Sequence, residues 1–214
     1  MVTLLASIAF VPILIPVIIG LVKFNKAGLA ERSIVYLVVL ALVAELISSA
    51  LWRVEMNNLF ISHILTPIEL FLLLSYYGRQ FGSRFRLLVL GVACLFVIFA
   101  IIDMTVLHSP FKMNALAKTV ECIILIVLSL VVWGKTMIAL QSNTLNSTPL
   151  FWINSAVLIY FSANILLFIF SLKILNTGEL AIWIWKIHFV FMTIYYLLIS
   201  IGLWKIKGGK NLSN

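Results

Sequence analysis

The sequence predicts an all-α fold, a bundle of seven transmembrane helices. Hydrophobic residues make up 64% of the 214 residues and charged residues only 10%, whereas a soluble domain carries about a quarter charged residues. The hydrophobic residues gather in seven runs, each near the roughly 20 residues that a helix needs to cross a bilayer. Most Lys and Arg residues fall between these runs. We therefore expect most of the protein surface to face lipid.

The expected helices follow the apolar runs in chain order. The first, residues 4–22, contains Pro12 and Pro16 and is followed by Lys23, so we expect a retained helix and not a cleaved signal peptide. The others are expected at residues 33–52, 59–78, 87–107, 119–140, 151–172 and 182–204. Because no stretch has the Gly, Ser and Pro content of an interdomain linker, residues 1–214 are expected to form a single integral membrane domain.

The positive residues predict how the bundle is oriented. Ten lie on one side of the expected membrane, namely Lys23, Lys26, Arg32, Arg79, Arg84, Arg86, Lys135, Lys205, Lys207 and Lys210. Five lie on or near the other side, namely Arg53, Lys112, Lys118, Lys173 and Lys186. Because cytoplasmic loops carry an excess of Lys and Arg, this distribution predicts an N-terminus outside and a C-terminus in the cytoplasm. The positive residues form no stripe interleaved with aromatic residues, so we expect no nucleic-acid partner.

Polar residues inside the apolar runs are the candidates for function, because an unpaired polar group in a membrane is costly. With this orientation Glu45, His63, Glu69 and His188 all fall in the outer half of the bundle. The inner half of the same helices is nearly all Leu, Ile, Val and Phe. The sequence therefore predicts an outward-facing polar pocket above an apolar plug.

Helical spacing gathers further residues around this pocket. Ser48 and Ser49 follow Glu45 at three and four residues, and Thr66 precedes Glu69 by three, so each set shares a helix face. Tyr195 shares a face with His188 in the last helix. The expected ligand-binding residues are Glu45, Ser48, Ser49, His63, Thr66, Glu69, His188 and Tyr195.

The leading functional hypothesis is a binding or sensory protein for a small or lipid-like molecule. Membrane lipid surrounds the bundle, and the tail from Lys205 to Lys210 is too short for a signalling domain. Any output therefore requires a separate signalling or membrane partner protein. No residue is assigned a catalytic role.

Two alternatives remain open. In the first, His63, His188, Glu45 and Glu69 hold a metal, with zinc the candidate, and a bound water hydrolyses a lipid. No HExxH or CxxC spacing accompanies these residues. In the second, the protein is a small transporter, and Glu69 near the middle of its helix is the proton-coupling group.

Other polar residues are interpreted as structural. Glu121 and Asp103 lie near the ends of expected helices, where solvent reaches them, and Asn164 shares a face with Tyr160, which favours an interhelical hydrogen bond. Glu45 and Glu69 also have a structural interpretation, in which each makes an interhelical hydrogen bond instead of binding a ligand. For His63 and His188 the structural interpretation is a histidine at the membrane interface whose ring nitrogens are already hydrogen-bonded.

Three segments carry a resemblance. The run NNLFISHILTPIE at residues 57–69, with FWINS at 151–155 and WKIH at 185–188, resembles a family of uncharacterised short seven-helix membrane proteins of bacteria. This resemblance spans the chain and implies a multi-pass protein of the bacterial cytoplasmic (inner) membrane, with no assigned activity.

A second resemblance is more distant. The helix count is similar to that of the membrane hydrolases that include alkaline ceramidases, adiponectin receptors and lysoplasmalogenases, in which histidines near one membrane face hold a metal. It implies that Ser48, His63 and His188 occupy analogous places. The paired histidines of that group's last helix are absent here.

Overall fold

The computed structural model describes residues 10–107, 109, 111–139, 145–174 and 178–207. In these residues all regular secondary structure is helical, and the predicted all-α class is confirmed. The α-helices are α2 (Val11–Lys23), α3 (Leu29–Arg53), α4 (Leu59–Gly78), α5 (Gly82–Ile102), α6 (Ala115–Ala139), α7 (Pro149–Ile174) and α8 (Gly178–Trp204). Three short helical turns join them, at Phe24–Lys26, Asp103–Leu107 and Leu145–Ser147.

Six of these helices, α3 to α8, are long and apolar enough to cross a membrane. The chain is therefore a multi-pass membrane protein by helix length and composition. The described part of α2 has 13 residues, which span about 20 Å and fall short of a bilayer core of about 30 Å. The expected first helix began at residue 4, which lies outside the described residues. A seventh crossing thus stays a prediction.

Several helices begin earlier than their apolar runs. The helix expected at residues 33–52 starts at Leu29, so that Glu31 lies in its first turn. A carboxylate there is favoured by the partial positive charge of a helix N-terminus, and the Glu31 carboxylate lies close to Gly28 just before the helix. Hydrophobic runs locate the part of a helix inside lipid and miss such polar first turns.

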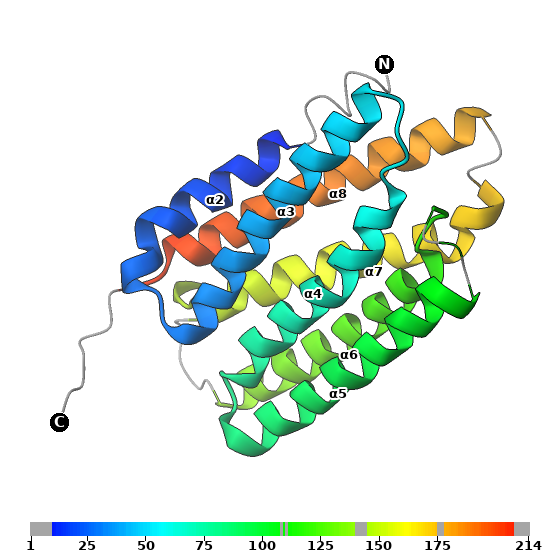
Figure 1. Ribbon diagram of the computed structural model, residues 1–214. Coiled ribbons are helices and arrows are strands. Elements are labelled where there is room, and N and C mark those ends of the chain that lie inside the picture. The colour runs from blue at the N-terminus through cyan, green and yellow to red at the C-terminus, as the bar shows by residue number, and fades with distance from the viewer. Residues whose placement is uncertain (1–9, 108, 110, 140–144, 175–177, 208–214) are drawn as a thin grey trace.

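Six helices form a closed ring with α5 outside it. Around the ring, α2 contacts α3, α3 contacts α4, α4 contacts α6, α6 contacts α7, α7 contacts α8, and α8 returns to α2. Helix α5 packs on α4 (Figure 1). A Cβ added at Gly20 would lie 3.1 Å from Val35 and 3.5 Å from Leu203, so this glycine lets α2 fit closely between α3 and α8.

The core and the outer surface are both apolar, as a lipid solvent requires. Leu70, Leu73 and Leu74 of α4 are almost fully buried at the centre of the bundle. On the outside, Leu87 and Leu95 of α5 are 75% and 69% exposed. A soluble protein would not carry such residues over a continuous surface, and the expectation of a lipid-facing surface is supported.

The helices alternate in direction, so the bundle has two ends (Figure 1). We call them the Arg79 end, where α4 stops and α5 starts, and the Asn57 end, where α3 stops and α4 starts. The C-terminal ends of α2, α6 and α8 also lie at the Arg79 end (Figure 1). Which end faces the cytoplasm stays a prediction from the charge distribution.

Candidate functional site

Two carboxylates and one ammonium meet inside the bundle, between α4 and α6. The Lys118 Nζ lies 2.6 Å from Glu69 Oε2 and 2.8 Å from Glu121 Oε2. The side chains of Lys118 and Glu69 are each 14% exposed, and Glu121 is fully buried. We call these three residues the Lys118 cluster. Packing of α4 against α6 brings Glu69 to the pair that Lys118 and Glu121 form along one helix face.

The cluster holds two carboxyl groups and one amine. With all three groups ionised, two negative charges face one positive charge in a region where charges are poorly solvated. Glu121 Oε1 is buried and has no hydrogen-bond partner in the described part of the chain. Glu121 Oε1 is therefore an acceptor that could take one more positive charge or hydrogen-bond donor.

Aromatic and amide side chains of α7 and α8 form the other side of this region. His188 Nδ1 lies 2.6 Å from Asn164 Oδ1, and Asn164 Nδ2 donates to the Tyr160 carbonyl at 2.7 Å. Because the Asn164 amide donates through its nitrogen, its oxygen accepts, so His188 Nδ1 carries the proton. The rings of Tyr160 and Tyr195 lie 4.7 Å apart. We call these four residues the Tyr160 wall.

The Tyr160 wall and the Lys118 cluster belong to one polar region. The Tyr160 hydroxyl lies within electrostatic range of Glu69, Lys118 and Glu121, and the Tyr195 hydroxyl lies within range of Glu69. Tyr195 is 3% exposed, and its hydroxyl has no hydrogen-bond partner among the described residues. Two unsatisfied polar groups, Glu121 Oε1 and the Tyr195 hydroxyl, thus occur in the same region.

Of the residues predicted from the sequence, Glu69, His188 and Tyr195 are placed in this polar region. His63 and Thr66 have other partners. His63 Nε2 bonds the Lys112 carbonyl at 3.1 Å, and Asn114 Nδ2 donates to Thr66 Oγ1 at 3.0 Å. Both contacts fasten the segment before α6 to the side of α4. They hold Lys118 in position because α6 begins directly after Asn114.

The predicted residues of α3 lie apart from these contacts. Glu45, Ser48 and Ser49 are each partly exposed, and the Ser48 carbonyl accepts a hydrogen bond from Asn58 Nδ2 at 3.1 Å. The Glu45 carboxylate makes no hydrogen bond or ion pair to any described residue, although it lies within electrostatic range of the Tyr196 hydroxyl. Glu45 is thus a further acceptor beside α8, not a member of the Lys118 cluster.

The half of the bundle toward the Arg79 end is not purely apolar, which corrects the predicted apolar plug. Tyr77 donates from its hydroxyl to Asn154 Oδ1 at 2.8 Å, and Asn154 Nδ2 donates to the Ser129 carbonyl at 3.1 Å. All three residues are buried. These positions lie in three different apolar runs, and only helix packing brings them together. We call them the Tyr77 trio.

Two further predictions are wrong. Glu121 and Asp103 were expected at solvated boundaries, yet they are 0% and 1% exposed. Helix α6 starts at Ala115, four residues before the expected start, so Glu121 lies in its second turn. A π-helical turn continues α5 from Asp103 to Leu107. Both acids therefore lie inside helices and not at their ends.

The metal site of the alternative hypothesis is not formed. Among the described residues, no group of three His, Cys, Asp or Glu side chains could hold a metal ion. His63 bonds the Lys112 carbonyl and His188 bonds Asn164, so the two histidines have different partners. The four residues expected as zinc ligands are therefore not brought together.

Comparisons with known proteins identify no family for this chain. No protein-family model, curated protein or solved structure matches the chain. The resemblances drawn from residues 57–69, 151–155 and 185–188 therefore stay hypotheses.

Proposed function

We propose that this protein binds a small or lipid-like molecule that carries one positive charge, within the bundle between the Lys118 cluster and the Tyr160 wall. The observation that carries the proposal is that Glu69 and Glu121 share a single ammonium, that of Lys118. A cationic group would balance the charge and donate a hydrogen bond to Glu121 Oε1. The rings of Tyr160 and Tyr195, which lie against each other, would place aromatic groups near the same cation.

Differences in exposure indicate how a ligand enters. Glu69, Lys118, Tyr160 and His188 are partly exposed, whereas the Tyr77 trio is sealed. We infer that a ligand enters through an opening on the side of the Asn57 end, away from the sealed Tyr77 trio. With the orientation predicted from the positive residues, the opening faces outward, and the protein acts as a binding or sensory component that requires a partner protein for output.

Thermal unfolding with charge-matched probes tests the proposal. We expect octylammonium to raise the unfolding temperature of the purified protein, and octanol and octanoate of the same chain length to have little effect. At ten times its dissociation constant a ligand contributes about 1.4 kcal/mol, which corresponds to about 3–6 °C for a chain of this size. Equal shifts from all three probes would show that the apolar chain alone is bound.

Variants of the cluster locate the effect. Glu121→Gln and Glu69→Gln each remove one negative charge, and we expect either to abolish the octylammonium shift. Glu55→Gln is the matched control, because Glu55 is an exposed acid at the Asn57 end, outside the bundle interior. A shift that survives both cluster variants would place the binding site elsewhere.

A small transporter is the second candidate, and the Tyr77 trio favours it. The trio continues buried polar groups from the Lys118 cluster into the half of the bundle toward the Arg79 end. Uptake of methylammonium into vesicles that contain the purified protein distinguishes the two functions. A transporter accumulates it faster than vesicles without protein and loses this with Glu69→Gln, whereas a binding protein gives no uptake.

A further inference from the structure

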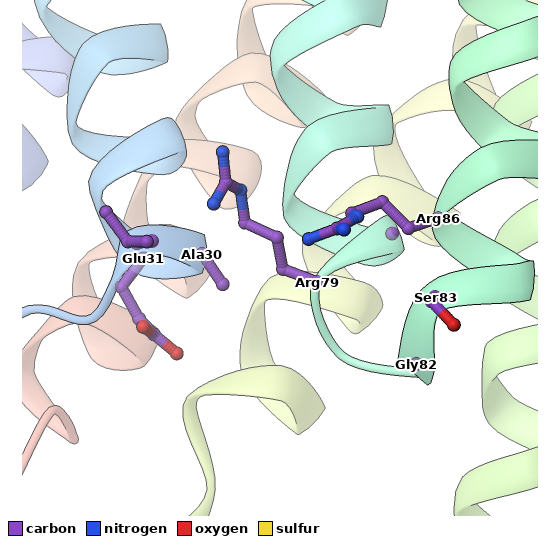
Figure 2. Close-up of a pocket in the computed structure, with 8 residues that line it drawn as sticks. Ala30, Glu31, Arg79, Gly82, Ser83 and Arg86 are labelled. Atoms are coloured by element: carbon purple, nitrogen blue, oxygen red, sulfur yellow. The ribbon is translucent and has the colours of Figure 1, made fainter.

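A groove at the Arg79 end lies between the start of α3, the end of α4 and the start of α5. It has a volume of about 460 Å³, and Arg79 and Arg86 line it together with Leu29 and Ser83. Figure 2 shows Arg86 reaching from α5 toward Arg79, while the Glu31 carboxylate lies away from both arginines. The groove thus presents two positive side chains together, with Glu31 also in its lining.

Close contact between α4 and α5 builds this arrangement. A Cβ added at Gly78 would lie 2.7 Å from Val89 Cγ2 and 3.2 Å from the Arg86 Cα, so only glycine allows α5 to approach so near. Gly82 has a φ of +76°, a left-handed conformation that lets the chain reverse within a few residues. As a result Arg79, which directly follows α4, and Arg86 of α5 line the same groove.

The two arginines differ from three other positive residues at this end, Lys23, Arg32 and Lys135, which already have partners within the protein. Lys23 donates to the Ile206 carbonyl, Arg32 donates to the Ala27 carbonyl, and Lys135 lies over the ring of Phe85. In the described part of the chain, neither the Arg79 nor the Arg86 guanidinium group makes a hydrogen bond or an ion pair. Their guanidinium groups are available to a ligand from outside.

We propose that this Arg79–Arg86 groove binds a phosphate group, as carried by the headgroup of an anionic phospholipid. The planar guanidinium group matches two phosphate oxygens at once, and two such groups in one groove suit a single phosphate. The groove lies where the apolar helices end, which is the depth of lipid headgroups. Leu29 is 65% exposed and lines the groove, so an acyl chain has an apolar surface beside the phosphate.

Lipid and free phosphate are distinguished by two arms of one experiment. The full chain in detergent is unfolded thermally with phosphatidylglycerol, with phosphatidylcholine, and with sodium phosphate against sodium chloride of equal ionic strength. A larger shift from phosphatidylglycerol than from either phosphatidylcholine or sodium phosphate identifies a lipid headgroup. An equal shift from sodium phosphate identifies free phosphate as sufficient. No shift from phosphatidylglycerol or from phosphate overturns the proposal.

Charge-matched variants tie the effect to the groove. Arg79→Gln with Arg86→Gln is expected to weaken phosphatidylglycerol binding by about tenfold or more, because at least one charge-assisted pair is lost. Lys26→Gln with Arg84→Gln removes the same charge from exposed residues at the same end that do not line this groove. An equal loss in both double variants would show general surface attraction and would overturn the site.

A conservative double substitution tests the groove even if the double Gln variant does not fold. Arg79→Lys with Arg86→Lys keeps both positive charges but removes the bidentate geometry. We expect this variant to unfold at the wild-type temperature without lipid and to retain fewer phosphatidylglycerol molecules in native mass spectrometry. Retention equal to that of the wild type would contradict a phosphate site built on guanidinium groups.

Discussion

At the scale of single residues, Lys118 is the group on which the polar interior depends. It is the positive partner of both Glu69 and Glu121, and Glu121 is fully buried. Without the ammonium, two carboxylates would face each other in a region with little water. Removing one partner of a buried ion pair leaves an uncompensated charge, which costs more than an exposed pair ever contributes.

We predict that Lys118→Met lowers the free energy of unfolding by about 3–5 kcal/mol. Reversible unfolding in mixed micelles measures the change. Lys112→Met is the control, because the exposed Lys112 side chain has no partner in the described residues, and it should change stability by about 0.5 kcal/mol or less. Adding Glu121→Gln to Lys118→Met should recover part of the loss, and a Lys118→Met protein as stable as the wild type would refute the charge argument.

Two buried tyrosine hydroxyls differ in their hydrogen bonding. The Tyr195 hydroxyl has no partner among the described residues, whereas Tyr77 donates to Asn154. We predict that Tyr77→Phe costs about 1–3 kcal/mol, because Asn154 is left with an unsatisfied acceptor. Tyr195→Phe should leave the unfolding temperature unchanged or raised.

The same Tyr195→Phe variant also tests the ligand site. If the free hydroxyl serves the bound molecule, the variant should weaken octylammonium binding in titration calorimetry even though it is stable. Unchanged affinity would mean that Tyr195 is only a packing residue of the core.

Sequence reasoning predicted part of this site. Glu69 and His188 stood out because a polar residue inside an apolar run is costly. Lys118 and Glu121 were missed as site residues because they lie near the edge of their run, although their spacing of three residues is that of a helical ion pair. Which way that helix face points depends on packing against α4 and α7, and a single sequence does not contain this information.

At the scale of helices, close packing depends on glycines at particular contacts. Gly202 lies where α8 crosses the start of α7, and a Cβ there would be 2.7 Å from Ile153 Cγ1. Gly134 of α6 is exposed, with open space around its Cβ position. The two positions look alike in the sequence, since each is a lone glycine late in an apolar run.

We predict opposite results for alanine at these two glycines. Gly202→Ala should destabilise the protein by about 1–3 kcal/mol through overpacking against Ile153. Gly134→Ala should be neutral or stabilising by about 1 kcal/mol or less, because alanine favours the helix and meets no neighbour. Unfolding midpoints of the two variants in one detergent provide the comparison, and equal effects would contradict the described contact of α7 with α8.

Helix positions were predicted better than helix ends. The run at residues 59–78 matches α4, because the helix begins directly after Asn58 and ends before Arg79. For α5 the sequence placed the start at residue 87, five residues late, because the polar turn around Arg84 is not hydrophobic. Hydropathy indicates which residues lie in lipid, whereas backbone hydrogen bonds continue a helix into the polar residues beyond the lipid.

At the scale of the whole molecule, charge distribution predicts the orientation and cysteine labelling measures it. In a variant with Cys94 and Cys122 changed to Ala, Met56→Cys places an exposed thiol at the Asn57 end and Asn25→Cys places one at the Arg79 end. We predict that a membrane-impermeant maleimide added to intact cells labels the first and not the second. The opposite labelling pattern would show that the predicted orientation is inverted and that the polar region faces the cytoplasm.

The closed ring has a consequence for how the protein is made. Helix α2 rests against α8, and the contact from Lys23 to Ile206 joins positions 183 residues apart. At the usual rates of synthesis, roughly ten to forty seconds pass between the two. During that time α2 has α3 beside it but not its second neighbour. A ribosome that stalls before α8 therefore leaves an open arc of helices whose two free edges are exposed to the insertion machinery, and release of the last helix completes the ring in one step.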